Sequence, residues 1–147
     1  MRRLLGAMRR EGDGVDLAPQ PGLENLDFLV ETVGRAGLPV GLHVDGDPRP
    51  LPRAVDLSAY RIVQEGLTNT LKHAHASHAE VTIHYRPEEV RIEVRDDGEG
   101  GSSDGAGHGL LGIHERVKIY GGEMSAGAAA GGGFVLSARL PIEGYEP

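Results

Sequence analysis

The stretch R-I-V-Q-E-G-L-T-N-T-L-K-H-A at residues 61–74 decides how this chain of 147 residues folds. It lies within a longer helical pattern that we predict to run from Leu57 to His75, with Asp56 as its N-cap. At about 100° per residue, one side of this helix packs on the rest of the fold. That side carries Ala59, Val63, Leu67, Thr70 and Ala74. The opposite side carries an acid, an amide, an ammonium group and an imidazole, which are Glu65, Asn69, Lys72 and His73.

A polar helix face is most often a solvated surface with ordinary ion pairs between neighbouring turns. Asn69 is unexpected on such a face, because Asn is a poor helix former and prefers helix ends. An amide oxygen is, however, a good ligand for a hard cation. Glu65 lies one turn earlier, where its carboxylate could polarise a water molecule or help to hold the ion. This face is therefore a candidate functional site.

Working outward from the long helix, hydrophobic periodicity and turn residues predict the remaining elements. These are a helix at 23–35, a strand at 40–44, a hairpin of strands 81–85 and 90–94, a helix at 110–120 and a strand pair at 124–126 and 134–140. Gly121 and Gly122 close the last helix as a C-cap pair. Strand pairs mixed with helices, without strand–helix–strand alternation, predict an α+β fold: a two-layer α/β sandwich whose sheet has helices on one face.

Composition excludes several classes of protein. Acids outnumber bases 22 to 15, giving a net charge of −7, which argues against a nucleic-acid clamp and against a basic lipid-binding patch. Cysteine is absent, so disulfides and thiolate metal sites are excluded. No apolar run approaches the ~18 residues needed to span a bilayer, and we expect no signal peptide.

Glycine gathers in two segments, with seven of the 23 at 98–112 and six at 121–133. The sequence D-D-G-E-G at 96–100 leaves a predicted strand, where a carboxylate can accept an amino hydrogen from a base and glycines let the backbone lie against a ring. The sequence G-H-G-L-L-G at 107–112 runs into a helix, whose free N–H groups favour phosphate. Neither is a Walker A loop or a dinucleotide-binding fingerprint.

These three segments, in this order, resemble the N-box, G1 box and G2 box of the ATP-binding domain of sensor histidine kinases. More narrowly, they resemble the group whose response regulators carry LuxR-type helix-turn-helix domains. The sequence G-G-G-F-V-L-S-A-R-L-P at 131–141 is similar to the closing strand of that family. The resemblance covers roughly residues 23–141. It implies a Bergerat-type ATP-binding fold with a mixed sheet, shared with gyrase B, MutL and a heat-shock chaperone.

The resemblance also implies roles by position. Asn69 would coordinate a Mg²⁺ ion that bridges the phosphates of ATP, and Glu65 would be the N-box acid. Lys72 and His73 would approach the phosphates, and Asp96 would take the adenine amino group. The residues that would shape the base pocket, the lid hinge and its phosphate contacts are Gly98, Gly100, Gly107, His108, Gly109, Leu110 and Gly112.

Three departures from the family pattern stand out. The stretch 101–106 between the two glycine boxes is short, which implies a minimal ATP lid. Phe134 stands where the family often has Thr, which puts one polar nucleotide contact in doubt. Ile113 and His114 replace the Met and Arg that the group often has.

The function implied is that of a histidine-kinase catalytic domain, which donates the γ-phosphoryl of Mg-ATP to a histidine for relay to a response-regulator aspartate. None of the seven histidines lies on a helical hairpin before this domain, so we expect the phosphoacceptor on a separate dimerisation segment. Residues 1–12 would be a remnant of that segment, and 13–147 the catalytic domain. ATP implies the cytoplasmic side, with no contact to nucleic acid or membrane by this domain.

Two alternatives remain open. One is an ATPase of the gyrase B or MutL kind, in which Glu65 would act as general base for water. The other is an anti-sigma-type module that binds nucleotide, docks a partner and phosphorylates a serine.

Overall fold

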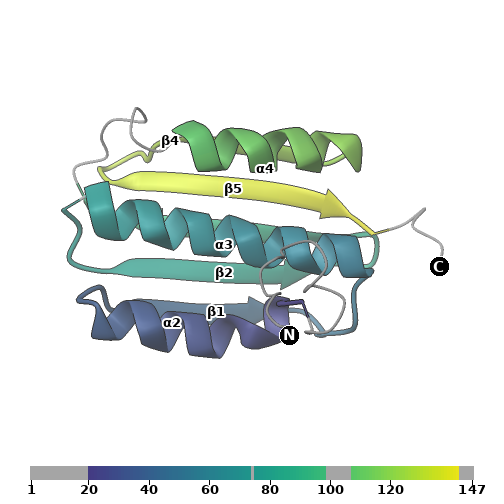
Figure 1. Cartoon of the computed structure of the whole chain (residues 1–147), viewed down its shortest axis with the longest axis horizontal. Helices are drawn as coiled ribbons and strands as arrows, with labels where there is room; N and C mark the ends of the chain where they lie inside the picture. The colour runs from purple at the N-terminus through teal and green to yellow at the C-terminus, as the bar shows by residue number, and fades with distance from the viewer. Residues whose placement is uncertain (1–19, 74, 99–106, 143–147) are drawn as a thin grey trace, which may run out of the picture.

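The computed structural model describes residues 20–73, 75–98 and 107–142 (Figure 1). Its elements follow the predicted order. They are the 3-10 turn η1 (Leu23–Asn25), α2 (Leu26–Arg35), β1 (Val40–Asp45), α3 (Arg53–His73), β2 (Ala79–Tyr85), β3 (Glu89–Asp96), α4 (Gly107–Ile119), β4 (Glu123–Ala128) and β5 (Phe134–Pro141).

The strands form one mixed sheet in the order β1-β2-β3-β5-β4. The pair β1–β2 is parallel, and the other three pairs are antiparallel. Figure 1 shows α2, α3 and α4 side by side over one face of this sheet, with α3 crossing the middle. The predicted α+β sandwich with a mixed sheet and helices on one face is therefore confirmed.

The core lies between α3 and the central strands. Its largest side chains are at most 1 % exposed and include Ile62, Leu67, Ile83, Ile92 and Leu136. Gly66 lets α3 come close to the sheet, because a Cβ atom there would lie 3.1 Å from Leu136 Cδ2 and 3.2 Å from Val94 Cγ1. This close approach brings the next turn of α3 to the end of β3.

The predicted bounds of the long helix were wrong at both ends. The helix begins at Arg53, because the carbonyl of Pro52 already accepts the N–H of Asp56 at 2.9 Å. Asp56 is therefore inside the first turn rather than the N-cap, and its carboxylate accepts the N–H of Leu23 instead. The described helix ends at His73, and His75 has φ +53, a left-handed conformation that no α-helix contains.

The second long helix also begins earlier than predicted, at Gly107 rather than at Leu110. Glycine is tolerated there because the first turn has N–H groups without intrahelical acceptors. The predicted glycine pair at the other end is confirmed. Gly121 has φ +82 and its N–H donates to the Lys118 carbonyl, while the N–H of Gly122 donates to the Val117 carbonyl.

The predicted remnant helix at 1–12 lies outside the described residues, as do Ala74, Gly100 and the short stretch 101–106. Among the helices that the structure describes, none is long and apolar enough to cross a bilayer.

Candidate functional site

Asp96 ends β3 on the face that the helices cover, and it is only 6 % exposed. The backbone N–H of Gly98 donates to its Oδ1 at 2.8 Å. The hydroxyl of Thr70, on α3, donates to its Oδ2 at 2.9 Å. The carboxylate is thus held from both oxygens, and each oxygen keeps a lone pair for a further donor.

Thr70 was predicted only as a core residue, and it is buried as predicted. Its contact with Asp96 was missed. The Oγ1 atom also lies 3.0 Å from the Gly66 carbonyl, but one hydroxyl proton serves one acceptor at a time. A carboxylate is the stronger acceptor of the two. The one feature of the sequence that could have indicated this contact was a hydroxyl on an otherwise apolar helix face, at the residue that follows Asn69.

Asn69 precedes Thr70, so it lies on the turn of α3 that contacts Asp96. Its Nδ2 atom is buried and has no hydrogen-bond partner among the described residues. Leaving a buried donor unpaired costs about 1–3 kcal/mol. A buried amide without a partner is what a site looks like when its ligand supplies the missing partner.

The other polar residues of α3 are less constrained. Glu65 is half-buried and Lys72 is exposed, and neither has an ion pair or hydrogen bond to another described residue. His73 is the last residue of the helix, and its side chain lies outside what the structure describes. Glu65 and Lys72 are therefore free to interact with a ligand.

Asp97, the neighbour of Asp96, points to a different set of partners. Its carboxylate accepts the hydroxyl of Ser77 and the backbone N–H groups of Ser77 and His78, the latter two at 2.9 and 3.0 Å. The Ser77 hydroxyl, followed by the His78 backbone N–H, holds the pKa of Asp97 well below its ordinary value. Of the two adjacent acids, Asp97 fastens a loop and Asp96 faces the helices.

Phe134 lies directly opposite Asp96 in the β3–β5 register, so the two side chains share one face of the sheet. Gly133, just before it, has φ +87, and a Cβ atom there would lie 2.1 Å from the Asp96 carbonyl oxygen. The start of β5 therefore presses against the backbone of Asp96. Phe134 is therefore the cross-strand neighbour of Asp96, at the position where the resemblance led us to expect Thr.

The second glycine box is divided between two places. Gly107, His108, Gly109 and Leu110 form the first turn of α4, of which the backbone alone is described. Gly112 is exposed in the body of α4 and lines a cavity between α3 and α4.

A metal ion bound at Asn69 would need ligands from outside the protein to complete its coordination shell. Within the described residues, no group of three or more His, Cys, Asp or Glu side chains could hold a metal ion. Asn69 supplies an amide oxygen, and Glu65, one turn earlier, supplies a carboxylate. Mg²⁺ is commonly held by one or two protein oxygens together with phosphate oxygens and waters. The residues fit an ion that arrives with a phosphate.

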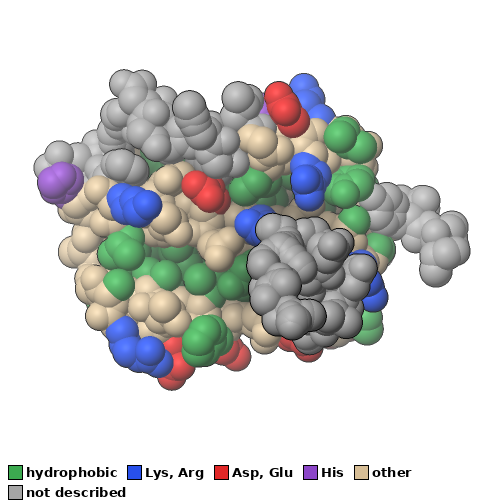
Figure 2. Space-filling model, viewed as in Figure 1, with side chains coloured by type: hydrophobic (Ala, Val, Ile, Leu, Met, Phe, Trp, Pro, Cys, Tyr) green, Lys and Arg blue, Asp and Glu red, His purple; other side chains and the backbone are tan. Residues whose placement is uncertain are grey.

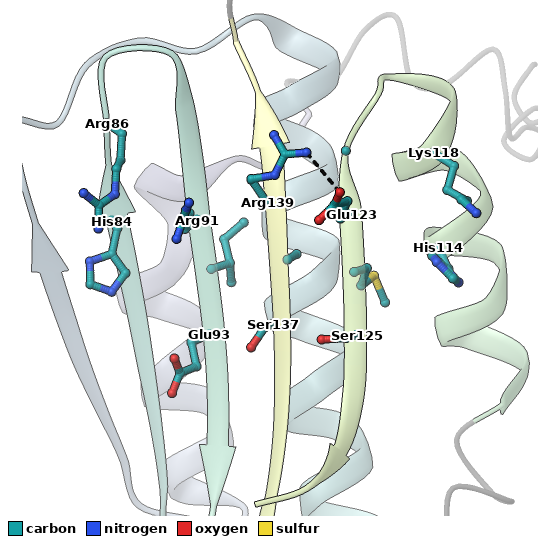
Figure 3. Close-up of a pocket in the computed structure, with 14 residues that line it drawn as sticks. His84, Arg86, Arg91, Glu93, His114, Lys118, Glu123, Ser125, Ser137 and Arg139 are labelled. Carbon is teal, nitrogen blue, oxygen red and sulfur yellow. Dashed lines mark ion pairs between the residues drawn. The ribbon is translucent and has the colours of Figure 1, made fainter.

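The opposite face of the sheet has a groove of about 650 Å³, drawn in Figure 3, but it lies away from Asn69 and Asp96. Its arginines are largely neutralised. Arg139 pairs with Glu123, as the dashed line shows, and Glu89 pairs with both Arg91 and Arg139. We therefore place the candidate site under the helices.

The comparisons with known proteins identify the family and the fold. Residues 54–144 match the family described as histidine kinase-, DNA gyrase B-, and HSP90-like ATPase. The sensor histidine kinase YxjM of Bacillus subtilis is 36 % identical over 123 residues, which cover 82 % of this chain. The chain spans only about 30 % of the length of that relative.

Two solved structures share the fold. The histidine kinase domain of the Erythrobacter litoralis EL346 blue-light activated histidine kinase has a TM-score of 0.63 at 22 % identity, covering 85 % of this chain and 65 % of that one. The ATP-binding domain of PrrB from Mycobacterium tuberculosis has a TM-score of 0.58 at 25 % identity, covering 81 % of this chain and 92 % of that one.

Proposed function

Because the chain belongs to the family of histidine kinase-, DNA gyrase B- and HSP90-like ATPases, we propose that it is the ATP-binding catalytic domain of a sensor histidine kinase. The observation that carries the proposal is the hydrogen bond between Thr70 and Asp96. It joins the end of β3, which carries Asp96, to the turn of α3 that carries Asn69, although the two residues are far apart in sequence. One nucleotide can then contact both.

At the base end, the carboxylate of Asp96 accepts a hydrogen from the adenine amino group. The hydroxyl of Thr70 and the N–H of Gly98 hold that carboxylate in position. The ring of Phe134 forms a neighbouring wall, and a flat aromatic wall suits a purine. Gly100 contributes to the same pocket.

At the phosphate end, Asn69 is the metal ligand and Glu65 assists it. Lys72 and His73 approach the phosphates. The first turn of α4, with Gly107, offers backbone N–H groups and a positive helix end, and its companions in phosphate contact are His108, Gly109, Leu110 and Gly112. Bound Mg²⁺ offsets the charge that develops on the transferred group.

The chain's own part in the reaction is to position ATP and to stabilise charge, which is where most catalysis of phosphoryl transfer arises. The acceptor is a histidine on a separate dimerisation segment, and residues 13–147 form the catalytic domain. The phosphoryl group then passes to a response-regulator aspartate. We further propose that this regulator is of the LuxR type and that the domain works on the cytoplasmic side.

The test is a titration with Mg-ATP or its non-hydrolysable analogue, followed by calorimetry. The adjacent acids offer a matched pair of variants. Asp96→Asn should weaken binding strongly, because the amide replaces one of the two acceptor oxygens by a donor while Thr70, Gly98 and the adenine amino group all donate here, whereas Asp97→Asn should bind as the parent does. Asn69→Asp should weaken binding of Mg-ATP. Absence of binding at millimolar nucleotide, or equal affinity of the two aspartate variants, would refute the proposal.

One observation favours a second function. The Glu65 carboxylate is half-buried, lies one turn from Asn69, and has no partner among the described residues. Such a carboxylate could act as general base for water, as in an ATPase of the gyrase B or MutL kind. Steady phosphate release by this chain alone, lost in Glu65→Ala and kept in Glu65→Asp, would establish the ATPase.

A further inference from the structure

A second cavity, of about 270 Å³, lies between α3 and α4. Its lining consists of Leu57, Ser58, Arg61, Gly112, Ile113 and Arg116. Arg61 precedes Asn69 by eight residues, which is about 12 Å along a helix. None of the residues whose contacts define the base end of the nucleotide site, Asp96, Thr70 and Gly98, belongs to this lining. The cavity is therefore separate from the base end of that site, and it shares Gly112 with the residues that we propose near the phosphates.

Arg61 and Arg116 bring two guanidinium groups to this one small cavity from two different helices. Neither has an ion pair or hydrogen bond with any other residue that the structure describes. Figure 2 shows basic side chains on this face near the seam between α3 and α4. The arginines of the opposite sheet face differ, because Arg91 and Arg139 each pair with a glutamate. Two exposed guanidinium groups without a partner at one cavity are able to bind an anion.

Ser58 gives an independent indication. It is 2 % exposed, and its hydroxyl is one of two buried side-chain groups in the described part of the chain that lack a hydrogen-bond partner. A Ser hydroxyl in a helix ordinarily finds an acceptor, such as a carbonyl one turn earlier. An anion seated in the cavity is the acceptor that this donor lacks.

The remaining walls indicate what carries the anion. Leu57 and Ile113 are half-buried apolar side chains, and Gly112 has no atom within 4 Å of where its Cβ would stand. A free inorganic ion gains nothing from apolar walls. A carboxylate on an aliphatic stem, flanked by other apolar side chains, gains from both parts of the lining.

We propose that Arg61, Arg116 and Ser58 form a binding site for the carboxylate of an acidic protein segment, whose apolar neighbours rest on Leu57 and Ile113. The matched residues are only about 30 % of the length of the relative YxjM, so such a segment can belong to the remainder of a protein of that length. None of its three polar residues is a proposed nucleotide contact, so the site can be tested in the absence of nucleotide.

The test uses two blocked peptides, acetyl-Leu-Glu-Leu-amide and acetyl-Leu-Gln-Leu-amide, and inorganic phosphate as a third probe. Each is titrated into the full chain without nucleotide, and NMR follows the Nε–H signals of Arg61 and Arg116 and the methyl groups of Ile113. We expect the glutamate peptide to bind about fivefold or more tightly than the glutamine peptide. Phosphate should bind more weakly than the glutamate peptide.

Variants separate the site from general attraction to a basic surface. Arg61→Gln and Arg116→Gln should each remove the preference for glutamate, while Arg53→Gln, on the same helix outside the cavity, should keep it. Thermal unfolding checks that each variant is folded. Equal binding of the two peptides, a preference that survives in the double variant, or phosphate binding as tight as the glutamate peptide would each overturn the proposal. Loss of ATP binding would leave these results unchanged, so the two proposals fail separately.

Discussion

Thr70→Val tests the contact on which the base end of the site depends, because Val has nearly the shape of Thr but no hydroxyl. A hydrogen bond to a charged group contributes about 1.5–3 kcal/mol. Asp96 is 6 % exposed and keeps the bond from Gly98, so the substitution leaves one carboxylate oxygen without its donor. We expect the free energy of unfolding to fall by about 1.5 kcal/mol. For a domain of this size the melting temperature should fall by roughly 3–6 °C.

The effect of Thr70→Val on ATP binding shows whether the hydroxyl positions the carboxylate of Asp96 or only stabilises the fold. Without Thr70, the carboxylate of Asp96 is held by Gly98 alone, and we expect ATP to bind roughly 3- to 10-fold more weakly, which is about 1 kcal/mol. Purine riboside triphosphate lacks the amino group, so its affinity should not change. Calorimetric titration of both nucleotides measures this ratio.

Thr70→Ser is the matched control, since it keeps the hydroxyl and should keep the preference for ATP. If Val and Ser at this position bind ATP equally well, the hydroxyl serves the Gly66 carbonyl and not Asp96. If Thr70→Val weakens both nucleotides alike, the residue has only a structural role. Either result refutes the positioning role.

Three further predictions follow from single residues. Ser58→Ala removes an unpaired buried hydroxyl and should raise the free energy of unfolding by about 1 kcal/mol. If urea denaturation instead gives a lower free energy of unfolding, the hydroxyl has a partner. Gly133→Ala puts a methyl group against the Asp96 carbonyl at a residue with positive φ. It should lower the free energy of unfolding by at least about 1–2 kcal/mol, measured as a lower melting temperature. An unchanged melting temperature would contradict the tight contact. The hydrogen bond to Asp97 raises the pKa of His78 above its ordinary value of 6.5. The ion pair of His78 with Asp97 therefore stabilises the fold below pH 6.5, and this contribution is lost as the pH rises through the pKa that His78 has in the folded chain. His78→Gln should therefore destabilise the chain more at about pH 5.5 than at about pH 8.5, and equal losses in thermal melts would exclude the ion pair.

How far the sequence could predict the fold depended on the type of signal. Alternation in β3 runs through Val90, Ile92 and Val94, and continuing it by two residues places Asp96 inside and Asp97 outside, as the structure has them. A period of two assigns each residue of a strand to one face or the other from its neighbours in sequence alone. The start of α3 was missed by four residues, because Asp56 was taken as the N-cap whereas its N–H already donates to the carbonyl of Pro52 inside the first turn.

The site was harder to predict than the fold. The residue types at Asn69 and Asp96 could be singled out from chemistry, and their roles stay predictions until nucleotide binding is measured. The partner of Asp96 could not be found this way, because a Thr on an apolar helix face is ordinarily satisfied by a carbonyl one turn earlier. Only the close approach at Gly66 brings the Thr70 hydroxyl within reach of the carboxylate.

The two proposed sites share α3, and this fixes their separation. Between Arg61 and Asn69 the helix is anchored by Ile62, Val63 and Leu67, each with no measurable exposure. A helix packed this tightly does not stretch or bend at low cost. An acidic segment held at Arg61 would therefore sit at a set distance of about 12 Å along the helix from the residue proposed to bind the metal. If both proposals hold, the cavity between α3 and α4 sets where a docked segment lies relative to the phosphates of ATP, because the rigid helix α3 fixes the distance between the two sites.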